Sequence, residues 1–219
     1  MILYEKSTTI LALVFRNLGY PMESIVFDTW KPVSTVPPLS TDSIHLWRFP
    51  NLLHNRVHRR RILSEYLNIA PEKLQFKKGR HGKPYVDWPQ TTIQFSISHS
   101  NSLCLMAVHP HIEIGIDIER IQPRTNMLKI AHRMFTPQIS DKLANTPPNN
   151  RLKLFYYHWT QLEAQIKACG SSLFNTNLCC DATSIYSYSF IPDSEFQGCL
   201  AAFVPIPTIT QWNTLILNG

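Results

Sequence analysis

Hydrophobic and polar residues alternate most clearly in the stretch IEIGIDIER, residues 112–120. Isoleucine occupies every even position from 112 to 118, whereas Glu113, Gly115, Asp117 and Glu119 occupy the odd positions. Residues i and i+2 of a strand project from the same face. The stretch therefore predicts a β-strand with one apolar face and one face that carries carboxylates and a glycine.

Shorter runs with the same period of two predict further strands, and IQFSIS with SLCLMAVHP is expected to form a hairpin. A short strand is also expected after the turn in APEKLQF (70–76) and after the glycine-containing loop in KKGRHGKPYV (77–86). The main predicted strands are SIHLWRF (43–49), IQFSIS (93–98), SLCLMAVHP (102–110), SIYSYSF (184–190) and CLAAFVP (199–205).

Apolar residues at helical spacing predict helices at 7–18, 51–67, 124–136 and 151–170. The last helix is the longest, and Gly170 is expected to end it. Both halves of the chain combine helices with antiparallel strands. We therefore expect an α+β fold of two similar halves, residues 1–108 and 109–219.

A chain of 219 residues, 44% of them hydrophobic, can bury a sizeable core. The apolar run at 10–15 lacks a preceding basic segment, so we expect no signal peptide. No stretch approaches the roughly 20 apolar residues of a membrane span. The five cysteines show no CxxC spacing, and their odd number favours reduced thiols in a cytoplasmic protein.

The net charge of +6 comes from the first half of the chain. Residues 1–110 hold 13 Lys and Arg against 7 Asp and Glu, whereas residues 111–219 hold 8 of each. Nine of the basic residues lie between Arg56 and Lys83. Such a concentration indicates an anionic partner: a phosphate ligand, a nucleic acid, an acidic protein or a membrane. We expect no nucleic acid, since no aromatic residue interrupts the basic run 56–61, and no membrane, since no stretch is long enough to span one.

Asp117 and Glu119 project from the same face of their strand, so their carboxylates can converge on one point. Two oxygen ligands on a rigid strand suit Mg²⁺, which completes its coordination with water and phosphate oxygens. Gly115 beside them allows the close approach of a ligand or of another backbone. The alternative is an amphipathic strand whose acidic face lies in solvent.

Trp159, Glu163 and Lys167 share one face of the longest predicted helix, because they are four residues apart. One interpretation is an ordinary surface ion pair between Glu163 and Lys167. The other makes Glu163 a third oxygen ligand or a general base, with Lys167 in contact with a phosphate.

Three further stretches in the first half could bind phosphate. In FSISHS (95–100) the three serines share one face of the expected strand, and His99 lies where the hairpin begins to turn. These residues could bind phosphate, form a Ser/His nucleophilic pair or be an ordinary strand end. Lys83 lies in the loop GRHGKP, which could instead be a solvated turn. Arg56 and Arg60 share a helical face, which suits phosphate capture although many basic runs are only solvated.

Taken in chain order, GKP, FSISHS, GIDIE and WTQLEAQIKACG resemble the motifs of the 4′-phosphopantetheinyl transferases. The resemblance is greatest to the larger kind that activates peptide and polyketide synthetases, and it covers roughly residues 56–175. It implies two pseudo-symmetric α+β halves with the active site in the cleft between them. It also implies a monomer that transfers the phosphopantetheine arm of coenzyme A to a serine of an apo acyl or peptidyl carrier protein and releases 3′,5′-ADP.

The resemblance further implies a role for each matching residue. Asp117, Glu119 and Glu163 would hold Mg²⁺ against the pyrophosphate of coenzyme A. Glu163 would also deprotonate the carrier serine, and Lys167 would stabilise charge on the pyrophosphate. The residues implied in binding coenzyme A are Arg56, Lys83, Pro84, Ser98 and His99.

Some positions depart from the family pattern. Leu162 stands where the family has a lysine before the glutamate, Ser96 replaces an asparagine, and Asn101 replaces a glycine. The three carboxylates are intact, so we expect an active enzyme. The alternative is a degenerate member that binds coenzyme A or a carrier protein without turnover.

Overall fold

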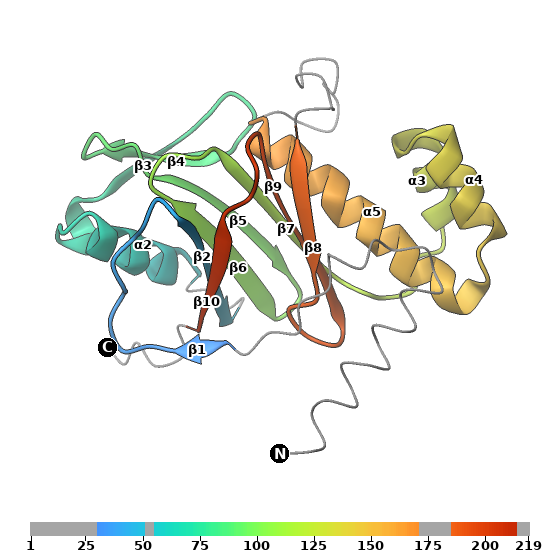
Figure 1. Ribbon diagram of the computed structural model, residues 1–219, viewed down its shortest axis with the longest axis horizontal. Helices are drawn as coiled ribbons and strands as arrows, with labels where there is room; N and C mark the ends of the chain where they lie inside the picture. Colours follow the sequence, from blue (N-terminus) through green and yellow to red (C-terminus); the bar gives the residue numbers. More distant parts are fainter. Residues whose placement is uncertain (1–29, 51–54, 171–184, 214–219) are drawn as a thin grey trace.

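The described strands and helices form two larger sheets with helices on their outer faces, and a separate two-stranded sheet (Figure 1). The structure is a computed structural model, and it describes residues 30–50, 55–170 and 185–213. The helix expected at 7–18 lies outside these ranges. Within the described part of the chain, no helix is long and apolar enough to cross a membrane.

The first sheet has five strands in the order β1-β10-β2-β6-β5. Strand β10 pairs in parallel with β2, whereas β2, β6 and β5 are antiparallel, which confirms the predicted hairpin. The bounds are β1 Lys31–Pro32, β2 Ser43–Pro50, β5 Gln94–Ser100, β6 Leu103–His109 and β10 Thr208–Asn213. The chain end therefore returns to the sheet built by the first half.

The second sheet has three antiparallel strands in the order β7-β9-β8. Its strands are β7 Ile114–Arg120, β8 Tyr186–Phe190 and β9 Phe196–Ala202, close to the predicted positions. A separate antiparallel pair consists of β3 Gln75–Lys78 and β4 Pro84–Trp88, preceded by the 3₁₀ helix η2, Pro71–Lys73.

Both sheets repeat one topology. Leaving aside the β3–β4 pair between α2 and β5, each sheet is built from a strand, a helix and two further strands: β2, α2 (Asn55–Tyr66), β5 and β6, and again β7, α5 (Pro148–Ala168), β8 and β9. In each sheet the last of the three strands lies between the other two. The second unit also contains α3 (Met127–Met134) and α4 (Pro137–Asn145), which lie near the N-terminal end of α5 (Figure 1).

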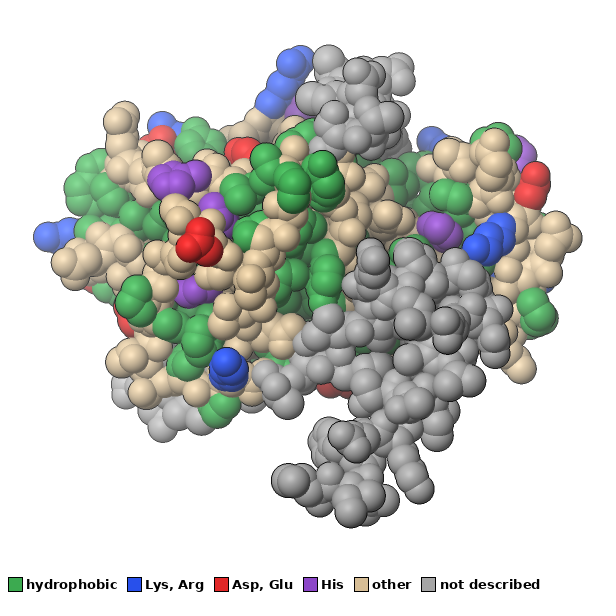
Figure 2. All heavy atoms as spheres, viewed as in Figure 1, with side chains coloured by type: hydrophobic (Ala, Val, Ile, Leu, Met, Phe, Trp, Pro, Cys, Tyr) green, Lys and Arg blue, Asp and Glu red, His purple; other side chains and the backbone are tan. Residues whose placement is uncertain are grey.

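The central core lies between the two sheets. The even positions of β7, Ile114, Ile116 and Ile118, pack here with Leu105 of β6 and Leu200 of β9. The opposite face of β6 packs toward α2, so every residue of β6 is buried, as its unbroken apolar sequence requires. Figure 2 shows hydrophobic side chains in the middle of one face, in the region of β8 and β10.

The helices predicted at 51–67, 124–136 and 151–170 are confirmed as α2, α3 and α5, and the bounds of α3 and α5 differ from the prediction by two or three residues at each end. Helix α5 begins at Pro148 rather than 151, because proline fits the first turn of a helix. Gly170 adopts φ +59° just after the helix, as expected of a C-terminal stop. Helix α4 was not predicted, although Thr136 caps it by accepting a hydrogen bond from the Ile139 nitrogen at 3.4 Å.

Candidate active site

Gly115 lets helix α5 lie directly against strand β7. A Cβ atom at this position would lie 1.9 Å from the Ala164 carbonyl oxygen and 2.3 Å from the Ala168 nitrogen. Both are backbone atoms of α5, so neither can turn aside as a side chain would. Of the two possibilities that the sequence left open, the close approach at Gly115 is that of a backbone.

Asp117 lies between strand β7 and this helix, and it accepts hydrogen bonds from both halves of the chain. Its Oδ1 accepts hydrogen bonds from Ser98 Oγ at 2.8 Å and from Lys167 Nζ at 2.7 Å. Lys167 Nζ also donates to Ser98 Oγ at 2.9 Å, which closes a triangle of polar groups. The Asp117 side chain is only 6% exposed, so the interpretation of β7 as having a solvated acidic face is wrong at this position.

Lys167 pairs with Asp117 across the helix–strand interface. No Glu163–Lys167 ion pair is found in the described part of the chain, so the interpretation of these residues as an ordinary surface pair on one helix is wrong. The Lys167 ammonium instead lies where α5, β5 and β7 meet, next to the buried carboxylate of Asp117.

The second oxygen of Asp117 has no hydrogen-bond partner although it is buried. Buried polar atoms are rarely left in this state, and each one needs an explanation. Burial raises the pKa of the Asp117 carboxyl, while Lys167 opposes the rise. An unpartnered carboxylate oxygen in such a place is a suitable ligand position for a cation.

Glu119 and Glu163 lie within electrostatic reach of Asp117. The pKa of Glu163 is raised to about 7, mostly by burial and then by the charge of Asp117, while Lys167 opposes the rise and Glu119 adds to it. Burial also raises the pKa of Glu119, although Ser100 Oγ donates to its Oε2 at 2.8 Å. The helix and the strand thus hold three mutually repelling carboxylates near one lysine.

The chemistry of these donors fits a magnesium ion, which was predicted here. As the side chains are placed, no three His, Cys, Asp or Glu residues of the described ranges form a ready metal-binding group. The donor set is nevertheless suitable, because Asp117 offers a free buried oxygen and the neighbouring carboxylates repel one another.

The serines of β5 have a structural role that the sequence did not reveal. Ser96, Ser98 and Ser100 accept hydrogen bonds from the backbone nitrogens of β7 at 3.1, 3.4 and 3.1 Å. Side-chain hydroxyls therefore join the edges of the two sheets where main-chain pairing is absent. Ser98 and Ser100 then use their own protons to hold the carboxylates of Asp117 and Glu119.

Replacing Ser96 by alanine is expected to lower the free energy of unfolding by about 1–3 kcal/mol. The buried Ile116 nitrogen would lose the Ser96 hydroxyl as its acceptor, and an unsatisfied buried donor has about this cost. Urea unfolding measures the change, with Ser102→Ala in the exposed turn after β5 as the control. Equal midpoints for the two variants would contradict the joining role.

Lys83 and Pro84 line a cavity of about 510 Å³ that both halves of the chain enclose. Lys83 Nζ lies 2.6 Å from Glu113 Oε2 and donates to the Ile114 carbonyl oxygen at 2.9 Å, so it ties this loop to the start of β7. The interpretation of GRHGKP as a merely solvated turn is therefore wrong for Lys83. Other residues of the cavity wall are Phe95, Ala168, Cys169, Gly170 and Phe203.

Arg56 lies in a second, strongly cationic cavity of about 350 Å³. Arg59 stacks over the Phe76 ring at 4.4 Å, and its buried Nε has no hydrogen-bond partner. His99 is exposed and lies on the α2-facing side of β5, opposite Ser98. The remaining residues that line this cavity are Arg60, Lys77, Lys78 and Pro84.

Arg124 is a residue near the carboxylates that sequence reasoning missed. It follows β7 and places its guanidinium carbon 5.5 Å from the centre of the Trp159 ring and 5.9 Å from that of Phe155. The two rings are stacked, with 12° between their planes. The aromatic spacing in α5 was visible in the sequence, but nothing there linked it to a lone arginine 35 residues earlier.

Residues 113–197, which include β7 and α5, match the model of the 4′-phosphopantetheinyl transferase superfamily. The 4′-phosphopantetheinyl transferase HetI of Nostoc sp. is 29% identical over 180 residues, which cover 66% of this chain and 76% of the relative. A putative 4′-phosphopantetheinyl transferase of Synechocystis sp. is 34% identical over 141 residues, 64% of this chain and 57% of the relative.

A third relative is the 4′-phosphopantetheinyl transferase gsp of Aneurinibacillus migulanus. It is 37% identical over 117 residues, which cover 52% of this chain and 46% of the relative. The chain thus spans about three quarters of the first relative and about half of the other two.

Proposed function

Since residues 113–197 belong to the 4′-phosphopantetheinyl transferase superfamily, we propose that this chain transfers the phosphopantetheine arm of coenzyme A to a serine of an apo carrier protein. The observation that carries the proposal is the cluster of Asp117, Lys167 and Glu163 at the contact of β7 with α5. Attack on a pyrophosphate requires positioning and charge stabilisation more than covalent catalysis, and this cluster offers both.

Glu163 is the proposed base. The pKa of about 7 leaves a useful fraction of its carboxylate ionised near neutral pH, and its proton affinity is high enough to accept the proton of the carrier serine. The serine oxygen then attacks the β-phosphorus, the bond from this phosphorus to the bridging oxygen breaks, and 3′,5′-ADP leaves with that oxygen. The base and the attacked phosphate need to lie on the same side of α5 for this step.

Lys167 is the proposed cation for the pyrophosphate. Its side chain is 29% exposed, so it can contact a ligand while its ammonium remains fixed by Asp117 and Ser98. Asp117, Glu119 and Glu163 are the residues that would hold Mg²⁺. When bound, that ion would neutralise charge on the two phosphates.

The nucleotide end of coenzyme A is proposed to use the two cavities that share Pro84. A volume of about 510 Å³ is within the usual range for a small-molecule site. The arginines of the second cavity and His99 suit a phosphate group, since they lie on the same side of β5. Lys83 and Arg56 are the residues proposed to contact the nucleotide.

The repeated strand–helix–strand–strand topology supports two pseudo-symmetric halves, divided near residues 108 and 109. The larger cavity supports a binding cleft between them, because its walls come from both. We further propose a cytoplasmic monomer. Among the described residues, Cys104 and Cys199 are buried thiols outside any disulfide, which agrees with a reducing compartment.

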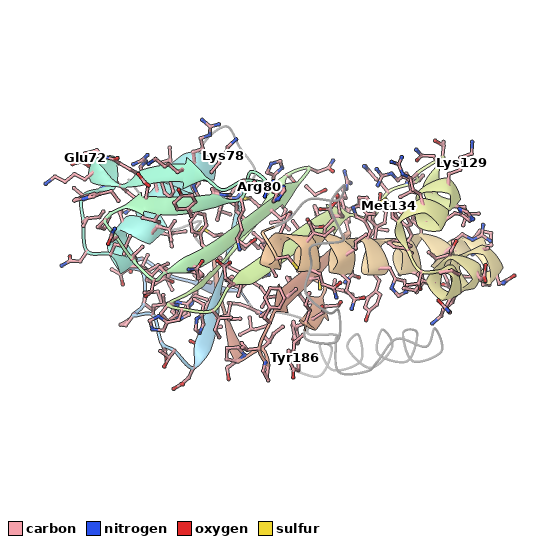
Figure 3. The ribbon with its side chains drawn as sticks, turned by 90° about the horizontal axis from the view of Figure 1, so that it is seen from above. Glu72, Lys78, Arg80, Lys129, Met134 and Tyr186 are labelled. Carbon is pink, nitrogen blue, oxygen red and sulfur yellow. The ribbon has the colours of Figure 1, made fainter. Side chains whose placement is uncertain are left out.

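The proposed partner is an acyl or peptidyl carrier protein. Lys129 lies on α3 at the helical end of the molecule, whereas Lys78 and Arg80 lie on the β3–β4 side (Figure 3). Basic residues on both sides of the candidate site would attract an acidic carrier.

The direct test is the intact mass of an apo acyl carrier protein after incubation with this protein, coenzyme A and Mg²⁺. We expect the carrier to gain one phosphopantetheine arm and to gain none when EDTA is present. A peptidyl carrier domain is assayed in parallel, and no gain on either carrier would contradict the proposal.

A second candidate function is the binding of coenzyme A without turnover, which Leu162 favours because the family has a lysine there. Calorimetry separates the two functions. Tight binding of coenzyme A with no mass gain on any carrier would support the binding module.

A further inference from the structure

The carboxylates of the candidate site outnumber the described cations that pair with them. Asp117, Glu119 and Glu163 lie around Lys167, and Lys167 is already hydrogen-bonded to Asp117. A pyrophosphate would bring further negative charge to this place. Even with Mg²⁺ held by the carboxylates, a protein cation that is not already paired with a carboxylate would be the better contact for the pyrophosphate oxygens, because Lys167 is shared with Asp117.

Arg124 meets this requirement by position. Burial raises the pKa of Glu119 and of Tyr156, and the charge of Arg124 opposes both rises, so its field reaches the carboxylate cluster. Its guanidinium lies over Trp159, which is one helical turn before Glu163 on the same face of α5. The arginine thus lies at the edge of the site, on the side of the proposed base.

The manner in which Arg124 is held leaves its N–H groups available. Aromatic rings position the guanidinium from one side, and no ion pair joins Arg124 to a carboxylate anywhere in residues 30–50, 55–170 and 185–213. The side chain is exposed. A planar guanidinium stacked on an aromatic face can still form two parallel hydrogen bonds with phosphate oxygens.

We propose that Arg124, stacked on Trp159, binds the pyrophosphate of coenzyme A and supplies the positive charge that Leu162 does not carry. Leu162 is three residues after Trp159, so positions 159 and 162 are neighbours on the helix surface, and Arg124 lies over the first of them. The inference rests on the proposed function, because it names the contact that this site makes with its substrate.

The first experiment measures the affinity for coenzyme A and for 3′-dephospho-coenzyme A by calorimetry. Arg124→Ala is expected to weaken both ligands equally, by about 10- to 100-fold, since a charge-assisted hydrogen-bonded contact is lost and both ligands contain the pyrophosphate. Arg124→Lys is expected to recover only part of the affinity, because an ammonium cannot form the two parallel bonds. Arg133→Ala in α3 removes the same charge at an exposed position and should leave both affinities unchanged.

The second experiment restores the charge from the other position. Leu162→Lys in the Arg124→Ala background is expected to regain affinity for coenzyme A, whereas Leu162→Lys alone should change it little. A double variant that binds as weakly as Arg124→Ala would overturn the proposal that the two positions supply one charge.

Two other results would also overturn it. One is an Arg124→Ala variant with native affinity for both ligands. The other is a variant in which only the KM for the carrier protein rises, which would assign Arg124 to carrier docking. The mass assay on the unaltered protein tests the proposed function separately: if that assay succeeds and the Arg124 variants bind normally, only this inference fails.

Discussion

Replacing Glu163 by glutamine is expected to lower kcat for phosphopantetheine transfer at least about a hundredfold. The amide has nearly the shape of the carboxyl group but cannot accept the serine proton or contribute a charge to the site, and the loss of one preorganised group of this kind has such an effect. Single-turnover transfer to an apo carrier protein measures the change. Glu72→Gln makes the same chemical change at an exposed position far from the site and should be neutral.

The same substitution is expected to stabilise the fold above pH 7 when no divalent metal is present. The folded state raises the pKa of Glu163 from 4.5 to about 7, so it binds this proton more tightly than the unfolded chain does. The contribution of Glu163 to the free energy of unfolding therefore falls as the pH rises from 4.5 to 7. Glutamine does not ionise and avoids this loss.

Urea unfolding at pH 8 in EDTA tests this expectation. A Glu163→Gln variant that is inactive and at least as stable as the unaltered protein would assign the lost rate to chemistry. A variant with a clearly lower midpoint would contradict the electrostatic account of the three carboxylates.

Replacing Gly115 by alanine is expected to disrupt both stability and activity. The new Cβ would lie 1.9 Å from the Ala164 carbonyl oxygen, so α5 has to move away from β7. Overpacking of this kind usually lowers the free energy of unfolding by about 1–3 kcal/mol. We expect a loss at the upper end of this range, because the atoms opposite Gly115 belong to the backbone and cannot rotate away. The displaced helix would carry Lys167 and Glu163 away from Asp117, and a shift of about 1 Å can cost a hundredfold in rate.

Gly79→Ala is the matched control for the stability measurement. A Cβ at Gly79 would meet only the Lys83 carbonyl oxygen, at an ordinary 3.6 Å, so its unfolding midpoint should be near native. A Gly115→Ala variant with a native unfolding midpoint and a native kcat would show that the close packing of α5 on β7 is not what positions Glu163 and Lys167.

The local elements of this protein could largely be predicted from the sequence. The alternation in 112–120 and the apolar period of 151–170 predicted β7 and α5, because the spacing of side chains along a strand or a helix depends only on local geometry. Helix α4 was missed because its nine residues carry too few turns of apolar pattern to be recognised, although Thr136 and Pro137 mark its start.

Contacts between distant segments could not be predicted in this way. Among the serines of β5, the resemblance implied a ligand contact for Ser98 alone, whereas in the structure all three join two sheet edges, and that role depends on β7 lying beside them. Strand β10 returns from the end of the chain to pair with β2, which no local pattern indicates. The roles of Arg56, Lys83, Pro84 and His99 toward a nucleotide remain predictions.

The sequence by itself determined which residues share a face: Asp117 with Glu119 on a strand, and Trp159 with Glu163 and Lys167 on a helix. Only the tertiary structure decided that these two faces meet, that Gly115 makes the meeting possible and that Arg124 comes to rest on Trp159. The reason is physical: periodicity is fixed by backbone geometry within a few residues, whereas a packing partner is chosen by the burial and hydrogen bonding of the whole chain.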